Sequence, residues 1–266
     1  MVLLAYMTIQ EITQNIEKYT EDPLSLLKTV GGYYECPKDT TGKRLGPLVG
    51  YAGKYTDATG VKKQYIGDVY ANFSKAEEYP VVLSHFAQLL KNKFELLQKE
   101  KGLPSFDVVC GPQMGGVAAA ILLALTSGTR YVCAEKEVLA LKTETMREQS
   151  RLIFGRHALK EGENVVIMED VLNNFSTTKE TIELIEKNGG RVIAILGLLN
   201  RSPHTEDSYE YTGEHTRQIP VISLVRKHIL EYTQEDPTVL EDMQKGNVVL
   251  KPKNAWSTLM QASEQK

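Results

Sequence analysis

Two adjacent carboxylates, Glu169 and Asp170, follow directly on a run of four apolar residues, Val165–Met168. A polar turn comes next and leads into a helix-like segment; the turn contains Asn173, Asn174, Phe175, Ser176 and Thr177. Ligands of open α/β sheets bind at the carboxyl ends of strands, and the N–H groups at a helix start can bind an anion. The order therefore predicts a site for a molecule that carries a phosphate together with sugar hydroxyls or Mg²⁺. The alternative is that the two acids only end a buried strand.

A second loop that could bind a ligand lies upstream, between a strand-like run and the small residues of a helix start. Its residues are Gly111, Pro112, Gln113, Met114, Gly115 and Gly116. Backbone N–H groups in such a loop can cradle an anion without any cationic side chain. The loop has neither the Gly-Lys-Ser/Thr of a Walker loop nor the GxGxxG spacing. Taken alone, it is interpreted equally well as a glycine turn before a helix.

The elements that must position these loops alternate regularly between strand and helix. Strands are expected at 106–110, 131–134, 165–168, 192–199 and, as the last one, 219–224; helices are expected at 81–97, 117–125 and 178–188. Four consecutive apolar residues are typical of a strand buried on both faces of a parallel sheet. The alternation therefore predicts an α/β fold with a mostly parallel central sheet flanked by helices.

Four further segments complete the expected organisation. Thr177 and Glu180 have the spacing of a capping box, so a helix is expected to begin just after the turn. Residues 7–30 have helical spacing with a break at Pro23, and residues 31–65 are rich in turn signals, which predicts short antiparallel strands. Residues 151–158 are expected to form part of a hairpin.

Composition limits the classes of function. The 266 residues carry a net charge of -3, which is not the footprint of a nucleic-acid-binding protein. No apolar stretch approaches the roughly 20 residues needed to cross a bilayer, and the first residues lack the basic region of a signal peptide. Cys36, Cys110 and Cys133 are far apart, which argues against zinc and favours a reducing cytoplasm.

The order of apolar residues, two acids and a polar turn resembles the ribose-phosphate signature of the type I phosphoribosyltransferases. The resemblance implies that Glu169 and Asp170 hold the ribose hydroxyls of phosphoribosyl pyrophosphate (PRPP) and that the turn wraps its 5′-phosphate. The turn residues so implied are Asn173, Asn174, Phe175, Ser176 and Thr177.

This turn departs from the family pattern. Asn173 and Asn174 stand where threonines are usual, and Phe175 and Ser176 stand where glycines are usual. Glycine serves there because the backbone must reach left-handed or close-approach geometry. A left-handed conformation at Phe175 would cost about 1–2 kcal/mol, so either the turn takes another path or the phosphate site is weakened.

The upstream glycine loop resembles the pyrophosphate loop of the same family. The resemblance implies that Gly111, Pro112, Gln113, Met114 and Gly115 bind the pyrophosphate of PRPP together with Lys136. Lys136 and Asp170 are the residues that it assigns to catalysis. Glu135 stands where an arginine often precedes the lysine.

Other segments look like orotate phosphoribosyltransferase in particular. Lys179 stands where those enzymes carry an arginine that contacts the orotate carboxylate, while residues 60–80 and 234–256 resemble their entry segment and C-terminal tail. The resemblance implies that Lys179 and Lys63 orient the base. It also implies Mg²⁺, bound through substrate and water oxygens with no direct protein ligand.

The implied function is transfer of ribose 5-phosphate from PRPP to orotate, or another pyrimidine base, in pyrimidine biosynthesis. The implied organisation is an N-terminal hood that recognises the base (1–75), an α/β core (76–230) and a C-terminal extension (231–266). A homodimer is expected, with the loop 137–150 crossing to the partner's site; no nucleic-acid or membrane partner is expected.

Several points stay open. The cations around this loop, Lys136, Lys142, Arg147 and Arg151, either close over the pyrophosphate or belong to a solvated charged segment. A phosphoribosyltransferase for another base is one alternative function. A non-catalytic nucleotide- or phosphate-binding regulatory protein on the same fold is the other.

Overall fold

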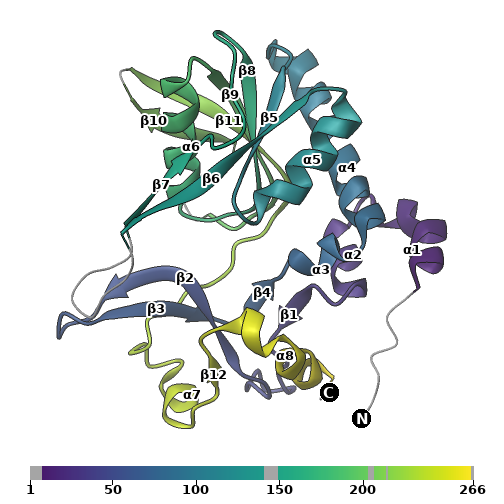
Figure 1. Cartoon of the computed structure of the whole chain (residues 1–266). Coiled ribbons are helices and arrows are strands. Elements are labelled where there is room, and N and C mark those ends of the chain that lie inside the picture. The colour runs from purple at the N-terminus through teal and green to yellow at the C-terminus, as the bar shows by residue number, and fades with distance from the viewer. Residues whose placement is uncertain (1–7, 141–148, 203–206, 214, 265–266) are drawn as a thin grey trace. The chain divides into compact units, whose positions relative to one another are not determined.

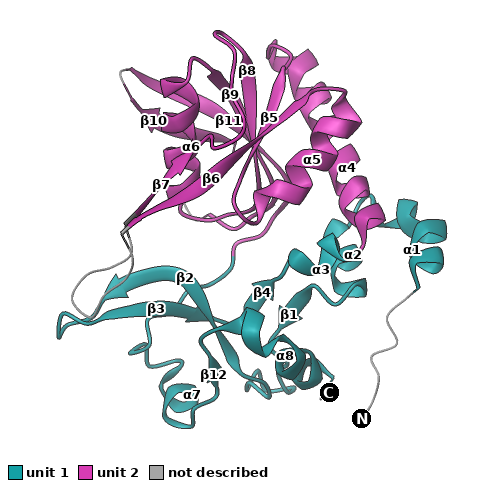
Figure 2. Cartoon of the chain, in the orientation of Figure 1, with its two compact units in different colours: residues 1–78, 229–266 teal, residues 79–228 magenta. Residues whose placement is uncertain are grey.

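The computed structural model describes residues 8–140, 149–202, 207–213 and 215–264. The chain forms two compact units (Figure 1, Figure 2). One unit consists of Tyr79–His228, and the other combines Met1–Glu78 with Ile229–Lys266. Among the helices in the described ranges, none combines the length and the apolar character that a membrane span requires.

A seven-stranded sheet forms the centre of the Tyr79–His228 unit, in the order β10-β11-β9-β8-β5-β6-β7. Its strands are β5 (Val108–Pro112), β6 (Arg130–Ala140), β7 (Gln149–Ile153), β8 (Asn164–Leu172), β9 (Arg191–Asn200), β10 (Ser208–Thr212) and β11 (Thr216–Arg226). The five inner strands run parallel, and each edge strand pairs antiparallel with its neighbour. The predicted fold class, a mostly parallel sheet flanked by helices, is confirmed.

Helices cover both faces of this sheet. Figure 1 shows α4 (Pro80–Lys101) and α5 (Gly116–Ser127) together on one side and α6 (Ser176–Lys187) on the other. The apolar run Val165–Met168 is completely buried between them, as predicted for a central parallel strand. On the α6 side, Ile182 and Ile185 pack in one core cluster with residues of β8 and β9.

Several predicted boundaries were wrong. β8 continues to Leu172, so Glu169 and Asp170 lie inside the strand and do not follow it; pairing with β9 persists, with Glu169 opposite Gly197 and Leu172 opposite Asn200. β6 is also longer than predicted, because β7 pairs along its second half. This pairing confirms the expected hairpin. β10 was not predicted.

The other unit is built from both sides of the core in sequence. It contains α1 (Ile9–Asn15), the 3-10 helix η1 (Ile16–Tyr19), α2 (Pro23–Thr29), β1 (Tyr33–Glu35), β2 (Leu48–Thr56), β3 (Lys62–Gly67), β4 (Val69–Ala71), α3 (Ser74–Glu77), α7 (Leu240–Gln244), β12 (Val248–Val249), η2 (Pro252–Ala255) and α8 (Trp256–Ser263). The helical break at Pro23 and the antiparallel strands after residue 31 are confirmed. The expectation that β11 is the last strand was wrong, because β12 joins β2.

Candidate functional site at the carboxyl edge of the sheet

The structure brings the two predicted loops together. β5, which leads into the glycine loop, pairs in parallel with β8, which carries the acids, so both reach the same edge of the sheet. A Cβ atom on Gly115 would lie 2.3 Å from Oδ2 of Asp170, and one on Gly116 would lie 2.2 Å from the backbone oxygen of Met168. An added Cβ would meet the β8 backbone at Gly116 and the Asp170 carboxylate at Gly115, because the loop lies directly against β8.

The two acids have different surroundings. Glu169 is only 9% exposed and contacts the start of α6 through the Thr178 side chain. Burial first, and the negative charge of Asp170 second, raise the pKa of Glu169 to about 8, while the hydrogen bond from Thr178 acts in the opposite direction. Asp170 is half-buried beside Gly115, and its Oδ1 accepts a hydrogen bond from the Val171 N–H at 2.7 Å.

The turn of residues 173–177, which is predicted to bind the 5′-phosphate, contains a left-handed residue although it has no glycine. Phe175 has φ 56° and ψ 15°, and among the non-glycine residues of the described ranges it alone has a positive φ. Its side chain is 6% exposed, and its ring stacks on Tyr209 with centroids 4.8 Å apart and planes inclined by 11°.

The energetic balance explains why phenylalanine is tolerated there. A left-handed residue with a side chain costs about 1–2 kcal/mol. Burial of a phenylalanine side chain stabilises by about 1.5–3 kcal/mol. A stacked aromatic pair adds about 0.5–1.5 kcal/mol. Burial and stacking of Phe175 therefore offset the cost of its backbone conformation.

The predicted capping box was wrong. α6 begins at Ser176, so Thr177 lies inside the helix and cannot cap it. Asn174 takes the role of a local acceptor, because its Oδ1 accepts hydrogen bonds from the Ser176 N–H (3.2 Å) and hydroxyl (2.9 Å). The first N–H groups of any α-helix have no acceptor within the helix, so the turn still presents an anion-binding end.

Lys136 is joined to the glycine loop through Gln113. The Gln113 N–H donates to the Ala134 carbonyl (3.0 Å), and its side-chain Oε1 accepts from the Lys136 N–H (3.2 Å). The Lys136 side chain is exposed. The peptide bond between Gln113 and Met114 is cis. The loop and the proposed catalytic lysine therefore share one segment of the sheet edge.

The two predicted base-binding lysines lie in different units. Lys179 is exposed on α6, with its Nζ 4.0 Å from Glu183. Lys63 lies in β3 of the other unit, where it pairs with Asp57 at 2.9 Å and with Glu235. Hydrogen bonds to Glu235 and Asp57 raise the pKa of Lys63. Its role in base binding stays a prediction.

The predicted crossing loop is described only in part. Lys142 and Arg147 lie outside the described residues. Arg151 is within β7, and its Nε donates to Glu137 at 2.6 Å across the hairpin. This pairing joins one of the four predicted cations to an acid of the same hairpin.

A polar group at the end of β9 was not predicted from the sequence. Asn200 pairs in register with Leu172 on one side and with Arg226 on the other, and it is fully buried. Its Oδ1 accepts from the Ser202 N–H at 2.9 Å, and Arg226 donates to the Ser202 carbonyl at 2.9 Å. Arg201 donates its N–H to the Leu172 carbonyl at 2.9 Å. A detectable signal was present, because polar residues follow a long apolar strand here just as they do in β8.

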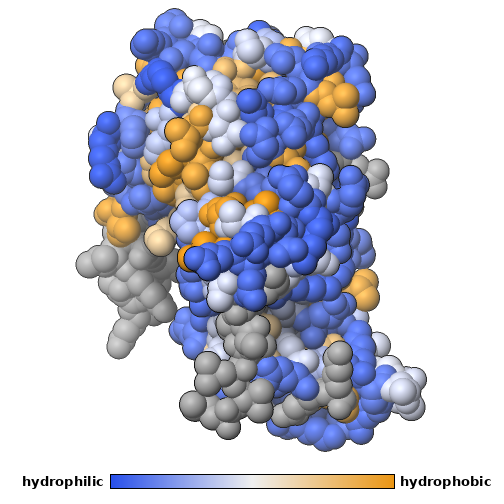
Figure 3. Space-filling view, turned by 90° about the vertical axis from the view of Figure 1, so that its right-hand side faces the viewer, coloured by the Kyte–Doolittle hydropathy of each residue, from blue (hydrophilic) through white to orange (hydrophobic). Residues whose placement is uncertain are grey.

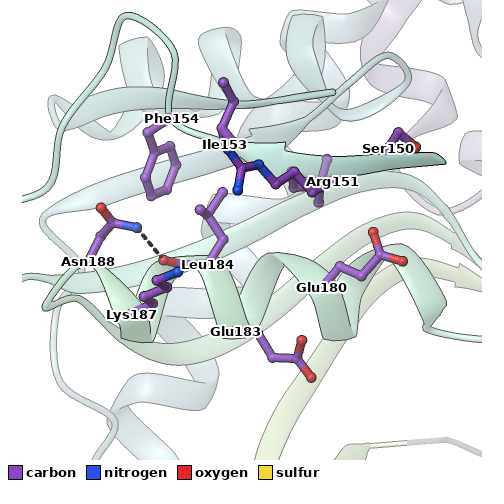
Figure 4. Close-up of a pocket in the computed structure, with 10 residues that line it drawn as sticks. Ser150, Arg151, Ile153, Phe154, Glu180, Glu183, Leu184, Lys187 and Asn188 are labelled. Atoms are coloured by element: carbon purple, nitrogen blue, oxygen red, sulfur yellow. Dashed lines mark hydrogen bonds between the residues drawn. The ribbon is translucent and has the colours of Figure 1, made fainter. Parts of the chain in front are cut away.

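A cleft of about 630 Å³ lies between β7 and α6 (Figure 4). Figure 4 places Arg151 on its strand side and Glu180, Glu183 and Lys187 on its helix side. Of the residues predicted for the site, only the candidate cation Arg151 is among those that line it, which are Ser150, Arg151, Leu152, Ile153, Phe154, Glu180, Glu183, Leu184, Lys187 and Asn188. The candidate site is therefore defined by the strand ends and loops and not by this cleft.

The chain is similar to known proteins in sequence and in structure. No family model matches the chain. It is 31% identical over 169 residues to an orotate phosphoribosyltransferase of Caldanaerobacter subterraneus subsp. tengcongensis, covering 64% of this chain and 75% of that protein. It is 30% identical over 169 residues to an orotate phosphoribosyltransferase of a Thermoanaerobacter species, with the same coverage of both.

Solved structures with a similar outline include two phosphoribosyltransferases. Orotate phosphoribosyltransferase from Aeropyrum pernix has a TM-score of 0.45 and 17% identity, covering 84% of this chain and 98% of that one. Adenine phosphoribosyltransferase from Thermoanaerobacter pseudethanolicus has a TM-score of 0.44 and 19% identity, covering 77% of this chain and 99% of that one.

Proposed function

We propose, because this chain belongs to the orotate phosphoribosyltransferase family, that it transfers ribose 5-phosphate from PRPP to orotate with release of pyrophosphate. The chain is accordingly a glycosyltransferase of the phosphoribosyltransferase class. Orotate is the base that we propose as its acceptor. The observation that carries it is the contact of Gly115 with Asp170, which unites an anion-binding loop and a sugar-binding acid at one edge.

Glu169 and Asp170 are proposed to hold the ribose hydroxyls. The transition state of such a transfer is oxocarbenium-like, with positive charge on the ribose and negative charge on the departing pyrophosphate. A carboxylate fixed beside the ribose stabilises the positive charge as it develops. Asp170 is proposed for this role because it is only half-buried and lies against the glycine loop.

The departing pyrophosphate is proposed to bind the backbone N–H groups of residues 111–115 and the ammonium of Lys136. The hydrogen bond between Gln113 and Lys136 supports this pairing. Mg²⁺, held through substrate and water oxygens, would supply further neutralisation of the leaving group. We propose no direct protein ligand for it.

The 5′-phosphate is proposed to bind at the turn that begins α6, through residues 173–177. The support is the left-handed backbone at Phe175 and the helix N-terminus that follows it. The amide side chains of Asn173 and Asn174 replace threonine hydroxyls and can still donate hydrogen bonds to phosphate oxygens.

If the base is orotate, its carboxylate requires a cation in the binding site. Lys179 and Lys63 were assigned to it by resemblance, and Arg201 is a further candidate because it follows β9 at the edge that carries the acids. Arginine can hold a carboxylate through two parallel hydrogen bonds, which lysine cannot. We therefore add Arg201 to the proposed base site.

A homodimer is proposed as the assembled form. Figure 3 shows hydrophobic surface gathered on the side of the Tyr79–His228 unit where α4 and α5 lie. Large apolar side chains near and along α5 are exposed: Met114 (85%), Ile121 (45%) and Leu125 (76%). Exposed apolar side chains that gather on one side of a protein are typical of an association site. Light scattering at micromolar concentration tests the proposal, and a strict monomer would contradict it.

The direct test of activity is incubation with PRPP, Mg²⁺ and orotate while the absorbance of orotate is followed. Consumption of orotate that depends on both PRPP and Mg²⁺ is the expected result. No turnover with orotate, together with turnover of purine bases from a panel, would move the assignment to another phosphoribosyltransferase.

A second candidate function is a non-catalytic PRPP- or nucleotide-binding regulator. The observation that favours it is the replacement of the usual threonines and glycines of the phosphate turn by Asn173, Asn174, Phe175 and Ser176. Calorimetry with PRPP and Mg²⁺ separates the two candidates. Tight binding without turnover would support the regulator, and no binding would contradict both.

A further inference from the structure

We infer that Tyr209 is a positioning residue for the 5′-phosphate turn, acting through its stacking contact with Phe175. This inference rests on the proposed function, because it concerns the turn to which that function assigns the phosphate. Tyr209 lies in β10, the edge strand, and is not itself at the end of any inner parallel strand.

The contact between the two rings is specific in geometry. Phe175 and Tyr209 are nearly parallel, with an interplanar angle of 11° and a centroid distance of 4.8 Å. Both belong to the core cluster on the α6 face of the sheet, Phe175 as a buried member and Tyr209 as a partly buried one. The Phe175 ring is therefore held in one place by residues outside the turn.

The position of that ring determines the backbone around it. A phenylalanine ordinarily avoids the left-handed region, so Phe175 remains there only while the alternative conformations would remove its ring from the cluster. The Phe175 carbonyl accepts the Lys179 N–H at 2.8 Å. The Ser176 N–H donates to Oδ1 of Asn174, and the next N–H of the helix belongs to Thr177. Rotation of the Phe175 backbone would redirect the Thr177 N–H away from a phosphate bound at the turn.

The stacking of Phe175 on Tyr209 thus stabilises the left-handed backbone that glycine would adopt without help. Glycine adopts the left-handed region without a side-chain partner, whereas Phe175 requires one. Removal of the Tyr209 ring should lower the fraction of molecules with a binding-competent turn, and apparent affinity falls in proportion to that fraction.

Tyr211 provides a matched control on the same strand. It lies two residues further along β10 and is therefore on the same face as Tyr209. It belongs to the same core cluster, but its ring contact is with the guanidinium of Arg217, 5.8 Å away. Loss of the Tyr211 ring removes a comparable amount of core packing from the same strand without removing the partner of Phe175.

The experiment measures PRPP affinity by calorimetry in the presence of Mg²⁺, and the melting temperature, for five variants of the full chain. Tyr209→Ala is expected to weaken PRPP binding about tenfold, the effect of a turn that is competent about a tenth of the time. Tyr211→Ala should lower the melting temperature at least as much and leave PRPP affinity unchanged. Tyr209→Phe keeps the stacking ring and should match the wild-type protein.

The fourth variant is Phe175→Gly, and the fifth combines Phe175→Gly with Tyr209→Ala. Its PRPP affinity should equal that of Phe175→Gly alone, because glycine at 175 no longer depends on the ring at 209. Equal losses of PRPP affinity in Tyr209→Ala and Tyr211→Ala would overturn the inference. It would also be overturned if Tyr209→Ala weakened PRPP binding as much in the Phe175→Gly background as in the wild-type protein.

A separate readout distinguishes failure of this inference from failure of the proposed function. If the wild-type protein binds no PRPP, the proposed function is wrong, and the turn is then examined without ligand. Amide chemical shifts of Ser176 and Thr177 should change in Tyr209→Ala, should not change in Tyr211→Ala, and should be insensitive to Tyr209→Ala once residue 175 is glycine. Unchanged shifts in Tyr209→Ala would overturn the inference.

Discussion

The Cβ position of Gly115 lies 2.3 Å from Oδ2 of Asp170, closer than a side-chain carbon can approach a carboxylate. The glycine loop therefore packs directly against the Asp170 carboxylate of β8, with no room for a side chain between them. Any side chain at residue 115 must displace either the loop backbone or the carboxylate, and both displacements change the proposed contacts with the substrate.

Gly115→Ala is expected to lower turnover with PRPP by about one to two decades, the equivalent of one lost charge-assisted contact of about 1.5–3 kcal/mol. The matched control is Gly53→Ala in β2, where the added Cβ would lie 3.5 Å from the Tyr65 ring, an ordinary contact distance. Steady-state kinetics of the two variants provide the measurement. Wild-type kcat/KM in Gly115→Ala would show that the loop contributes nothing at this point.

Asp170→Asn tests whether the acid acts on the substrate or only belongs to the strand. If Asp170 stabilises the ribose in the transition state, turnover should fall by about one to two decades while the melting temperature changes little. If the acid has only a structural place, PRPP affinity should persist and stability should rise, because repulsion with Glu169 is relieved. Unchanged PRPP affinity together with unchanged turnover would remove the basis of the functional proposal.

The raised pKa of Glu169 predicts how the stability of the folded chain depends on pH. Its pKa is about 8 in the folded chain against an ordinary value of 4.5, so between these pH values the folded state binds a proton that the unfolded state does not. Stability from this group is therefore highest below about pH 4.5 and is lost as the pH rises through about 8. Glu169→Gln should remove this loss.

The measurement for Glu169 is the melting temperature of the ligand-free protein at several pH values. For a chain of this size each kcal/mol corresponds to about 2–4 °C. As the pH rises from 5 to 8, the melting temperature of the wild-type protein should fall relative to that of Glu169→Gln. Parallel pH profiles of the two proteins would contradict a raised pKa at Glu169.

The base site is tested by comparing Lys179→Ala with Arg201→Ala. Loss of a cation that holds the orotate carboxylate should raise the KM for orotate about 10–100-fold while the KM for PRPP changes little. Lys187→Ala, an exposed lysine further along α6, is the control for general loss of positive charge. An effect in Arg201→Ala alone would show that the assignment of Lys179 is wrong.

The features predicted correctly from the sequence depend on short segments. The apolar run 165–168 identifies a central parallel strand by itself, and the loop at 111–116 is recognisable from its glycines and the small residues that follow. Their proximity also follows, because both come after parallel strands, whose carboxyl ends meet at one edge.

The features that escaped prediction depend on distant partners. The start of α6 was misplaced because Asn174, and not Thr177, accepts the hydrogen bonds at the helix N-terminus. The left-handed Phe175 depends on Tyr209, which lies in a strand that the sequence pattern did not indicate. No local signal in the turn reports that contact.

The unit that combines Met1–Glu78 with Ile229–Lys266 has a consequence for the order of folding during synthesis. Its parts meet through contacts such as the parallel pairing of Val248 with Leu48 and the hydrogen bond from the Trp256 indole to the Gly31 carbonyl at 2.9 Å. All of Tyr79–His228 leaves the ribosome before the second part of that unit does. The nascent chain can therefore assemble most of the seven-stranded sheet while its N-terminal segment still lacks its partner strand, and that segment is the one most exposed to chaperones and proteases.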